Sequence, residues 1–197
     1  FLLEGDAKYI DVMERTLYNG LISGVSLDGK SFFYPNPLES SGQHERSPWF
    51  GVACCPGNIT RFLASVPGYV YARRGDTIFV NLYAAGTADI ETEGGRTAKL
   101  VQDTRYPWDG GVKITVTPDR TRTFTIKARI PGWARNEAVP GDLYRFADGI
   151  DSAVTLAVNG EKLPVTDDHG YATIARTWKA GDVMTIALPM QVRRVVA

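Results

Sequence analysis

Apolar residues recur at helical spacing near the start of the chain. Ile10, Met13, Leu17 and Leu21 are separated by three or four residues, which places them on one face of a helix. Asp6 precedes this set and suits the N-cap position, where its carboxylate can accept a hydrogen bond from a backbone N–H. The pattern therefore predicts a helix from Asp6 to the Asn-Gly pair at residues 19–20.

A second, shorter helix is predicted directly after the sequence CCPG. Asn58 suits its N-cap, and the Pro-Gly pair at residues 67–68 ends it. Its apolar face consists of Ile59, Phe62, Leu63 and Val66. Between the two helices, residues 26–30 predict a turn, residues 31–34 a short extended segment and residues 39–48 a polar surface loop.

From residue 69 onward the period of the pattern changes from 3.6 to 2. Alternating segments lie at residues 78–83, 112–117, 123–130, 154–158 and 184–188. In the clearest of them, the apolar residues from Phe124 to Ile130 alternate with Thr125, Lys127 and Arg129, which we expect to face outward. An Asn-Gly pair at residues 159–160 predicts a hairpin turn. Many short strands separated by such turns are typical of an antiparallel β-sandwich.

Length and charge exclude several classes of protein. The 197 residues suffice for one domain or two small ones, and 22 Lys and Arg balance 22 Asp and Glu. Because a neutral chain has no net field to attract phosphates, we expect no nucleic-acid partner. The apolar runs are too short to span a bilayer, so we expect no membrane partner. No signal peptide is recognisable, and cytoplasmic and periplasmic locations both stay open.

The two cysteines, Cys54 and Cys55, are adjacent, which excludes a disulfide framework. One interpretation makes them small buried apolar side chains. Another uses their place before a helix N-terminus, where the backbone N–H groups favour a thiolate that can react or bind zinc. We expect His44, His169 and the carboxylate of Glu39 to be solvated in loops.

Three tryptophans of the β region could form platforms on which sugars stack. Trp108, Trp133 and Trp178 are more simply explained as residues that pack the sandwich core or its edge. We therefore expect them to pack the core or its edge.

Residues 49–58 (WFGVACCPGN), followed by Arg61, resemble the cysteine motif of glycoside hydrolase family 127, the β-L-arabinofuranosidase family. Further segments resemble the same family in the same order along the chain: residues 14–20 (ERTLYNG), 26–34 (SLDGKSFFY), 106–110 (YPWDG), 129–133 (RIPGW), 158–160 (VNG) and 188–190 (LPM).

This resemblance implies a mixed fold. Residues 1–68 would form the last helices and loops of a catalytic (α/α)6 barrel, and residues 69–197 an antiparallel β-sandwich region. The chain would then be the C-terminal portion of a longer enzyme, lacking the earlier helices of the barrel. Homodimers are compatible with this organisation.

The resemblance also implies a site and a reaction. Cys54 would be the nucleophile of a retaining glycosidase and form a thioglycosyl intermediate, in place of the usual carboxylate. Cys54 and Cys55 would bind Zn²⁺ together with an upstream glutamate and cysteine, and Tyr34 would line the sugar pocket. The general acid/base would be another upstream glutamate, and the substrate an arabinofuranoside-type oligosaccharide or glycan.

Two other functions stay open at this point. The chain could be a non-catalytic carbohydrate-binding or structural β-sandwich module, or a vicinal-dithiol module for redox chemistry or metal binding. Because half of the implied zinc ligands and the acid/base lie outside residues 1–197, we expect the isolated chain to be inactive and to bind zinc weakly.

Overall fold

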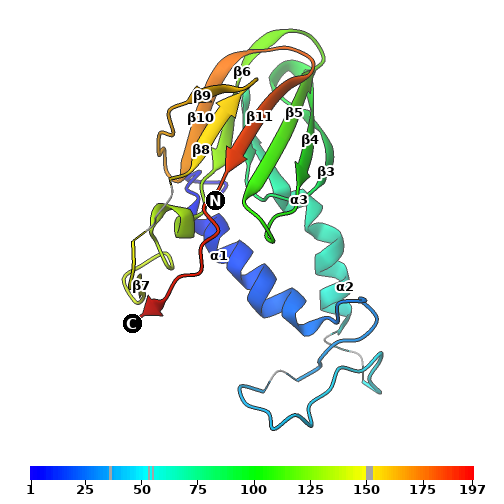
Figure 1. The fold of residues 1–197 in the computed structure, drawn as a ribbon. Coiled ribbons are helices and arrows are strands. Elements are labelled where there is room, and N and C mark those ends of the chain that lie inside the picture. The colour runs from blue at the N-terminus through cyan, green and yellow to red at the C-terminus, as the bar shows by residue number, and fades with distance from the viewer. Residues whose placement is uncertain (36, 53, 55, 150–152) are drawn as a thin grey trace. The chain divides into compact units, whose positions relative to one another are not determined.

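The computed structural model describes residues 1–35, 37–52, 54, 56–149 and 153–197 (Figure 1). Contacts between Cα atoms divide the chain into two compact units. The β unit consists of Phe1–Asp11 and Tyr69–Ala197, and the helical unit consists of Val12–Gly68. The β unit is therefore built from two separate segments of the chain.

Both predicted helices are present, with shifted ends. Helix α1 (Lys8–Thr16) begins where Asp6 Oδ1 accepts a hydrogen bond from the Lys8 N–H at 2.9 Å, as an N-cap does. A π-helical turn (Leu17–Leu21) and a 3₁₀ turn (Ile22–Gly24) continue it.

Helix α2 (Pro56–Ser65) begins two residues earlier than the sequence predicts, so the assignment of Asn58 as its N-cap is wrong. A proline suits the first turn of a helix, because its fixed φ is helical and its missing N–H would have no partner there. Asn58 instead accepts a hydrogen bond from Arg61. A four-residue helix, α3 (Pro67–Val70), follows. None of the helices in the described residues is long and apolar enough to cross a membrane.

The β unit contains two large sheets that share one core (Figure 1). The four-stranded sheet has the order β1 (Tyr71–Arg74), β2 (Thr77–Val80), β6 (Arg122–Arg129) and β10 (Tyr171–Trp178). The six-stranded sheet has the order β3 (Gly86–Glu91), β4 (Thr97–Thr104), β5 (Gly111–Pro118), β11 (Asp182–Ala187), β8 (Thr155–Val158) and β9 (Glu161–Leu163). A small separate pair joins β7 (Arg145–Phe146) to β12 (Val195–Val196).

The expected antiparallel pairing holds throughout the six-stranded sheet and for β1–β2 and β6–β10 of the other sheet, but not for the pair between them. Strands β2 and β6 are parallel, with Ile78 opposite Ile126. Parallel neighbours need a long connection, and here the chain passes through β3, β4 and β5 of the opposite sheet between them. The alternating pattern identifies strands but carries no information on this pairing.

The sheet faces that meet in the core follow the predicted alternation. Val112, Ile114 and Val116 of β5 are buried, as are Phe124, Ile126 and Ala128 of β6. The predicted hairpin between β8 and β9 is confirmed, because Asn159 and Gly160 have φ of 52° and 82°.

The outer face of the four-stranded sheet is covered by the first residues of the chain. Phe1 meets Phe79 edge to face with ring centroids 5.5 Å apart, and Phe79 meets Tyr171 in the same way at 5.4 Å. The backbone N–H of Ala7 donates to the carbonyl of His169 at 2.9 Å. This packing explains why Phe79 is buried although its neighbours Ile78 and Val80 already face the core.

Arg129 contradicts the expectation that it faces water, because its side chain is fully buried. Its Nη1 lies 2.6 Å from Oδ1 of Asp11 in α1, and its Nε donates to the carbonyl of Asn81. A buried charge requires such partners. The period-2 alternation gives the wrong exposure for Arg129 because α1 covers this residue on the outer face of β6.

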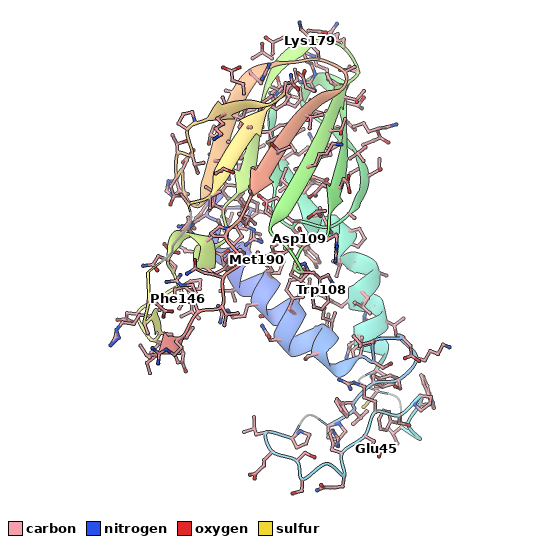
Figure 2. The ribbon with its side chains drawn as sticks, in the orientation of Figure 1. Glu45, Trp108, Asp109, Phe146, Lys179 and Met190 are labelled. Atoms are coloured by element: carbon pink, nitrogen blue, oxygen red, sulfur yellow. The ribbon has the colours of Figure 1, made fainter. Side chains whose placement is uncertain are left out.

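The three tryptophans differ in how far they are buried. Trp178 is fully buried and Trp133 packs against the core, as predicted. Trp108 is 81% exposed and does not pack against the core, so the expectation that it does is wrong. It lies in the loop between β4 and β5, at the same end of the sheets as Met190 and opposite to Lys179 (Figure 2).

Asp182 at the start of β11 gives a pH-dependent prediction. Its carboxylate accepts hydrogen bonds from Asn159 Nδ2 and the Lys179 N–H, both at 2.9 Å, and the bond from Asn159 is the main cause that lowers its pKa below the ordinary value. A lowered pKa in the folded state stabilises the protein above the unfolded pKa, and this contribution disappears as the pH falls through the folded value.

We therefore expect Asp182→Asn to lower the free energy of unfolding by about 1–2 kcal/mol at pH 7 and much less at acidic pH. Urea denaturation at several pH values measures the difference, and Asp89→Asn at an exposed position of β3 is the matched control. A deficit that is the same at all pH values would contradict the interpretation.

Candidate active site around Cys54

Hydrogen bonds hold together parts of the long loop between α1 and α2. Phe32 and Ser47 exchange two backbone hydrogen bonds, each 3.0 Å long, and Val25 also pairs with Phe32. Arg46 donates from Nη2 to the Ser23 carbonyl at 2.8 Å and from Nε to the Gly24 carbonyl at 3.1 Å. These bonds join residues 23–32 to residues 46–47 of the loop.

Aromatic rings pack within this loop. The ring of Phe50 lies 5.3 Å from both the ring of Phe32 and the ring of Tyr34, measured between centroids. On a second patch, His44 stacks on Phe33 at 4.4 Å, and the Arg46 guanidinium lies 4.3 Å from the centroid of the same ring. His44 is therefore partly covered and not the solvated residue we expected, because the Phe33 ring provides an apolar surface for it.

The structure brings Tyr34 and Cys54 together across twenty residues of sequence. Tyr34 Oη lies 2.7 Å from Cys54 Sγ in hydrogen-bond contact. Tyr34 is half-buried, whereas Cys54 is exposed two residues before the first residue of α2. The arrangement presents an accessible sulfur beside a phenol hydroxyl, at the helix end whose backbone N–H groups favour negative charge.

The other predicted site residues are not brought to this place. Cys55 lies outside the described residues. His169 is exposed in the turn before β10, and Glu39 is exposed in the loop, as expected. No group of three or more His, Cys, Asp or Glu side chains forms a metal site within the described part of the chain.

Two residues of the site have roles that sequence reasoning missed. Phe50 supports the Tyr34 ring, and Arg46 fastens the loop. The density of aromatic residues at positions 32–34 and 49–50 was an available signal for the first role. No sequence signal distinguishes Arg46 from other charged residues of a polar loop.

Comparison with protein families assigns both parts of the chain. Residues 1–68 match the model of the β-L-arabinofuranosidase GH127 catalytic domain, and residues 77–190 match that of the GH127 middle domain. The chain belongs to glycoside hydrolase family 127. The resemblance seen in the cysteine motif is thereby confirmed over most of the chain.

Individual GH127 relatives agree with this assignment. A solved GH127 β-arabinofuranosidase is 52% identical, with a TM-score of 0.93, and the match covers 100% of this chain and 31% of that one. A GH127 β-L-arabinofuranosidase from Geobacillus stearothermophilus T6 is 40% identical with a TM-score of 0.77, over 95% and 29% of the two chains. The non-reducing end β-L-arabinofuranosidase of Bifidobacterium longum subsp. longum is 35% identical, over 95% and 28%. The present chain thus spans less than a third of these GH127 proteins.

Proposed function

We propose that this chain is part of a retaining glycoside hydrolase that cleaves β-linked L-arabinofuranosides, with Cys54 as nucleophile. The observation that carries the proposal is the exposed Cys54 sulfur, held 2.7 Å from the Tyr34 hydroxyl directly before α2. The activity of the GH127 relatives supports the choice of substrate.

The proposed reaction has two displacements at the anomeric carbon. The Cys54 thiolate attacks this carbon, the glycosidic C–O bond breaks, and the leaving oxygen takes a proton from the general acid. Water then attacks the same carbon and gives a proton to the resulting base, while the C–S bond breaks and the sulfur leaves as a thiolate. Two inversions give net retention of configuration.

Tyr34 contributes to both displacements in this proposal. Its hydroxyl can donate a hydrogen bond to the thiolate before attack and again when the sulfur leaves. A hydrogen bond to a charged group contributes about 1.5–3 kcal/mol. The contact with Phe50 holds the Tyr34 ring in the orientation that this bond requires.

The thiol groups of this chain are suitable zinc ligands, but a complete zinc site requires further ligands. Cys54 supplies an accessible sulfur, and thiolates are preferred zinc ligands. We assign the remaining ligands to Cys55 and to an upstream glutamate and cysteine, as the family resemblance implies. Bound there, zinc would lower the pKa of the Cys54 thiol, so that the sulfur is charged at neutral pH.

The same proposal extends to the fold. Residues 1–68 would be the last helices of an (α/α)6 barrel, which the match to the GH127 catalytic domain supports. The general acid/base would be a glutamate of the same barrel, upstream of this chain.

Trapping the intermediate tests the proposal. The full-length protein is mixed with a β-L-arabinofuranoside, quenched with acid within one turnover and digested for tandem mass spectrometry. We expect a pentosyl group on the peptide that contains α2, and fragmentation should place it on Cys54. A pentosyl group on Cys55, or a product with inverted configuration by NMR, would overturn the assignment.

A further inference from the structure

The β unit contains a cavity of about 810 Å³ that the proposed reaction does not use. Three segments line it: the start of α1 at residues 6–8, the loop at residues 135–145 that leads into β7, and the turn at residues 167–170 before β10. All three belong to the β unit, whereas Cys54 belongs to the helical unit. The volume lies within the range of small-molecule sites.

One wall of the cavity is rigid and carries fixed charges. The Arg135 side chain is 15% exposed and donates from Nε to the Ile130 carbonyl at 3.0 Å. Its Nη1 lies 3.0 Å from Glu137 Oε1 and 3.3 Å from Asp167 Oδ2, and the Gly170 N–H donates to Asp167 Oδ1 at 2.6 Å. A carboxylate can accept about four hydrogen bonds, so both acids keep acceptor capacity for a ligand.

Other lining residues of the cavity carry polar side chains that form no hydrogen bond or ion pair among the described residues. Tyr144 is 48% exposed, and among the described residues its side chain and those of Asp142 and Arg145 have no hydrogen bond or ion pair. The Tyr144 ring offers an apolar face, and Arg145 offers several N–H donors. Figure 2 shows Phe146 on β7, the strand that contains Arg145.

The charges around the cavity indicate what kind of ligand it takes. Four carboxylates face three permanent cations: Asp6, Glu137, Asp142 and Asp167 against Lys8, Arg135 and Arg145. This near balance disfavours a phosphate or another strongly charged ligand. Interleaved acceptors and donors beside an aromatic ring suit a neutral ligand whose hydroxyls both donate and accept and whose ring has an apolar face.

We propose that this cavity is an auxiliary carbohydrate-binding site, in which a neutral sugar ring stacks on Tyr144 and its hydroxyls donate to Glu137 and Asp167. The choice of an L-arabinofuranosyl ring as the occupant rests on the proposed function. The site would hold a glycan through the β unit while another of its residues is hydrolysed.

NMR titration of the ¹⁵N-labelled 197-residue chain with methyl β-L-arabinofuranoside tests binding. We expect saturable shifts at the backbone amides of Asn136, Tyr144 and Gly170, with a Kd on the order of millimolar, about −4 kcal/mol. Tyr144→Ala and Glu137→Gln should each weaken binding at least about fivefold. Inorganic phosphate and galacturonate, titrated in parallel, should shift these amides less.

Trp108→Ala is the matched control, because Trp108 is an exposed aromatic residue of the same unit that does not line the cavity. Undiminished binding in Trp108→Ala supports the site. Loss of binding in that variant alone, tighter binding of phosphate, or no shift of the three amides would each overturn it. Thermal melting of each variant shows whether it is folded.

Failure of this proposal can be told apart from failure of the proposed function. In the full-length protein, Tyr144→Ala should leave hydrolysis of a small chromogenic arabinofuranoside unchanged and raise KM for a branched polysaccharide about fivefold or more. If hydrolysis is absent from the wild-type protein, the amide shifts still test the cavity. If hydrolysis is present but the amides do not shift, only the auxiliary site is lost.

Discussion

Cys54→Ala in the full-length protein is expected to lower kcat for a β-L-arabinofuranoside by at least about 10³–10⁴-fold, the usual consequence of removing a covalent nucleophile. The loss should be in chemistry and not in folding, because the Cys54 side chain is exposed and fills no core position. Steady-state kinetics and thermal melting of the same preparations measure the two effects separately.

Tyr34→Phe should cause a smaller loss of activity than Cys54→Ala. It keeps the ring that packs on Phe50 and removes only the hydroxyl beside the sulfur. Negative charge returns to the sulfur as the C–S bond breaks, and one hydrogen bond to a charged group corresponds to about 1.5–3 kcal/mol, so Tyr34→Phe should slow this second displacement by about 10- to 100-fold. If Cys54→Ala is as active as the wild type, Cys54 is not the nucleophile, irrespective of the activity of Tyr34→Phe.

Asp11→Ala should produce the largest loss of stability among the substitutions considered. Asp11 Oδ1 pairs with the fully buried Arg129 at 2.6 Å, and its Oδ2 accepts the Gly132 N–H at 3.2 Å and lies 3.5 Å from Arg135. Truncation removes the carboxylate that lies 2.6 Å from a fully buried guanidinium, and breaking a buried ion pair in this way costs about 3–5 kcal/mol. Urea denaturation of the 197-residue chain measures this loss.

An exposed ion pair provides the control for Asp11→Ala. Arg105 and Asp109 lie 3.7 Å apart with side chains 82% and 52% exposed, so Arg105→Ala, which keeps the hydrogen bond from the Gly111 N–H to Asp109, should change stability by less than about 1 kcal/mol. Replacing both Asp11 and Arg129 by apolar residues should destabilise the chain less than the sum of the single changes. Similar losses for Asp11→Ala and Arg105→Ala would show that the buried pair contributes no more than an exposed one.

Local signals in the sequence were sufficient for elements whose environment is set by their nearest neighbours. The Asn-Gly pair at residues 159–160 specified a hairpin, and the alternation in β5 specified a strand with one buried face. Strand β10 was missed, because its apolar positions are partly alanine and its polar positions partly threonine, which weakens the contrast between its two faces.

Residues whose environment depends on distant segments could not be predicted. Arg129 and Phe79 occupy outward-facing positions of the alternating pattern, but both are covered by residues 1–11, more than sixty positions away. The candidate site also combines a feature that the sequence reveals with one that depends on distant segments. The cysteine pair was visible in the sequence through its place before a helix, whereas the contact of Tyr34 with Cys54 depends on how a long loop folds back.

The packing of Phe1 and Ala7 on the four-stranded sheet constrains how this chain can evolve. A recombination that replaced residues 1–68 with another sequence would keep the strands but lose the Phe1 ring that covers Phe79 and the Asp11 carboxylate that pairs with Arg129. The new sequence would have to supply both groups. The strands and the segment ahead of the cysteines are therefore expected to be inherited together, as one discontinuous evolutionary module.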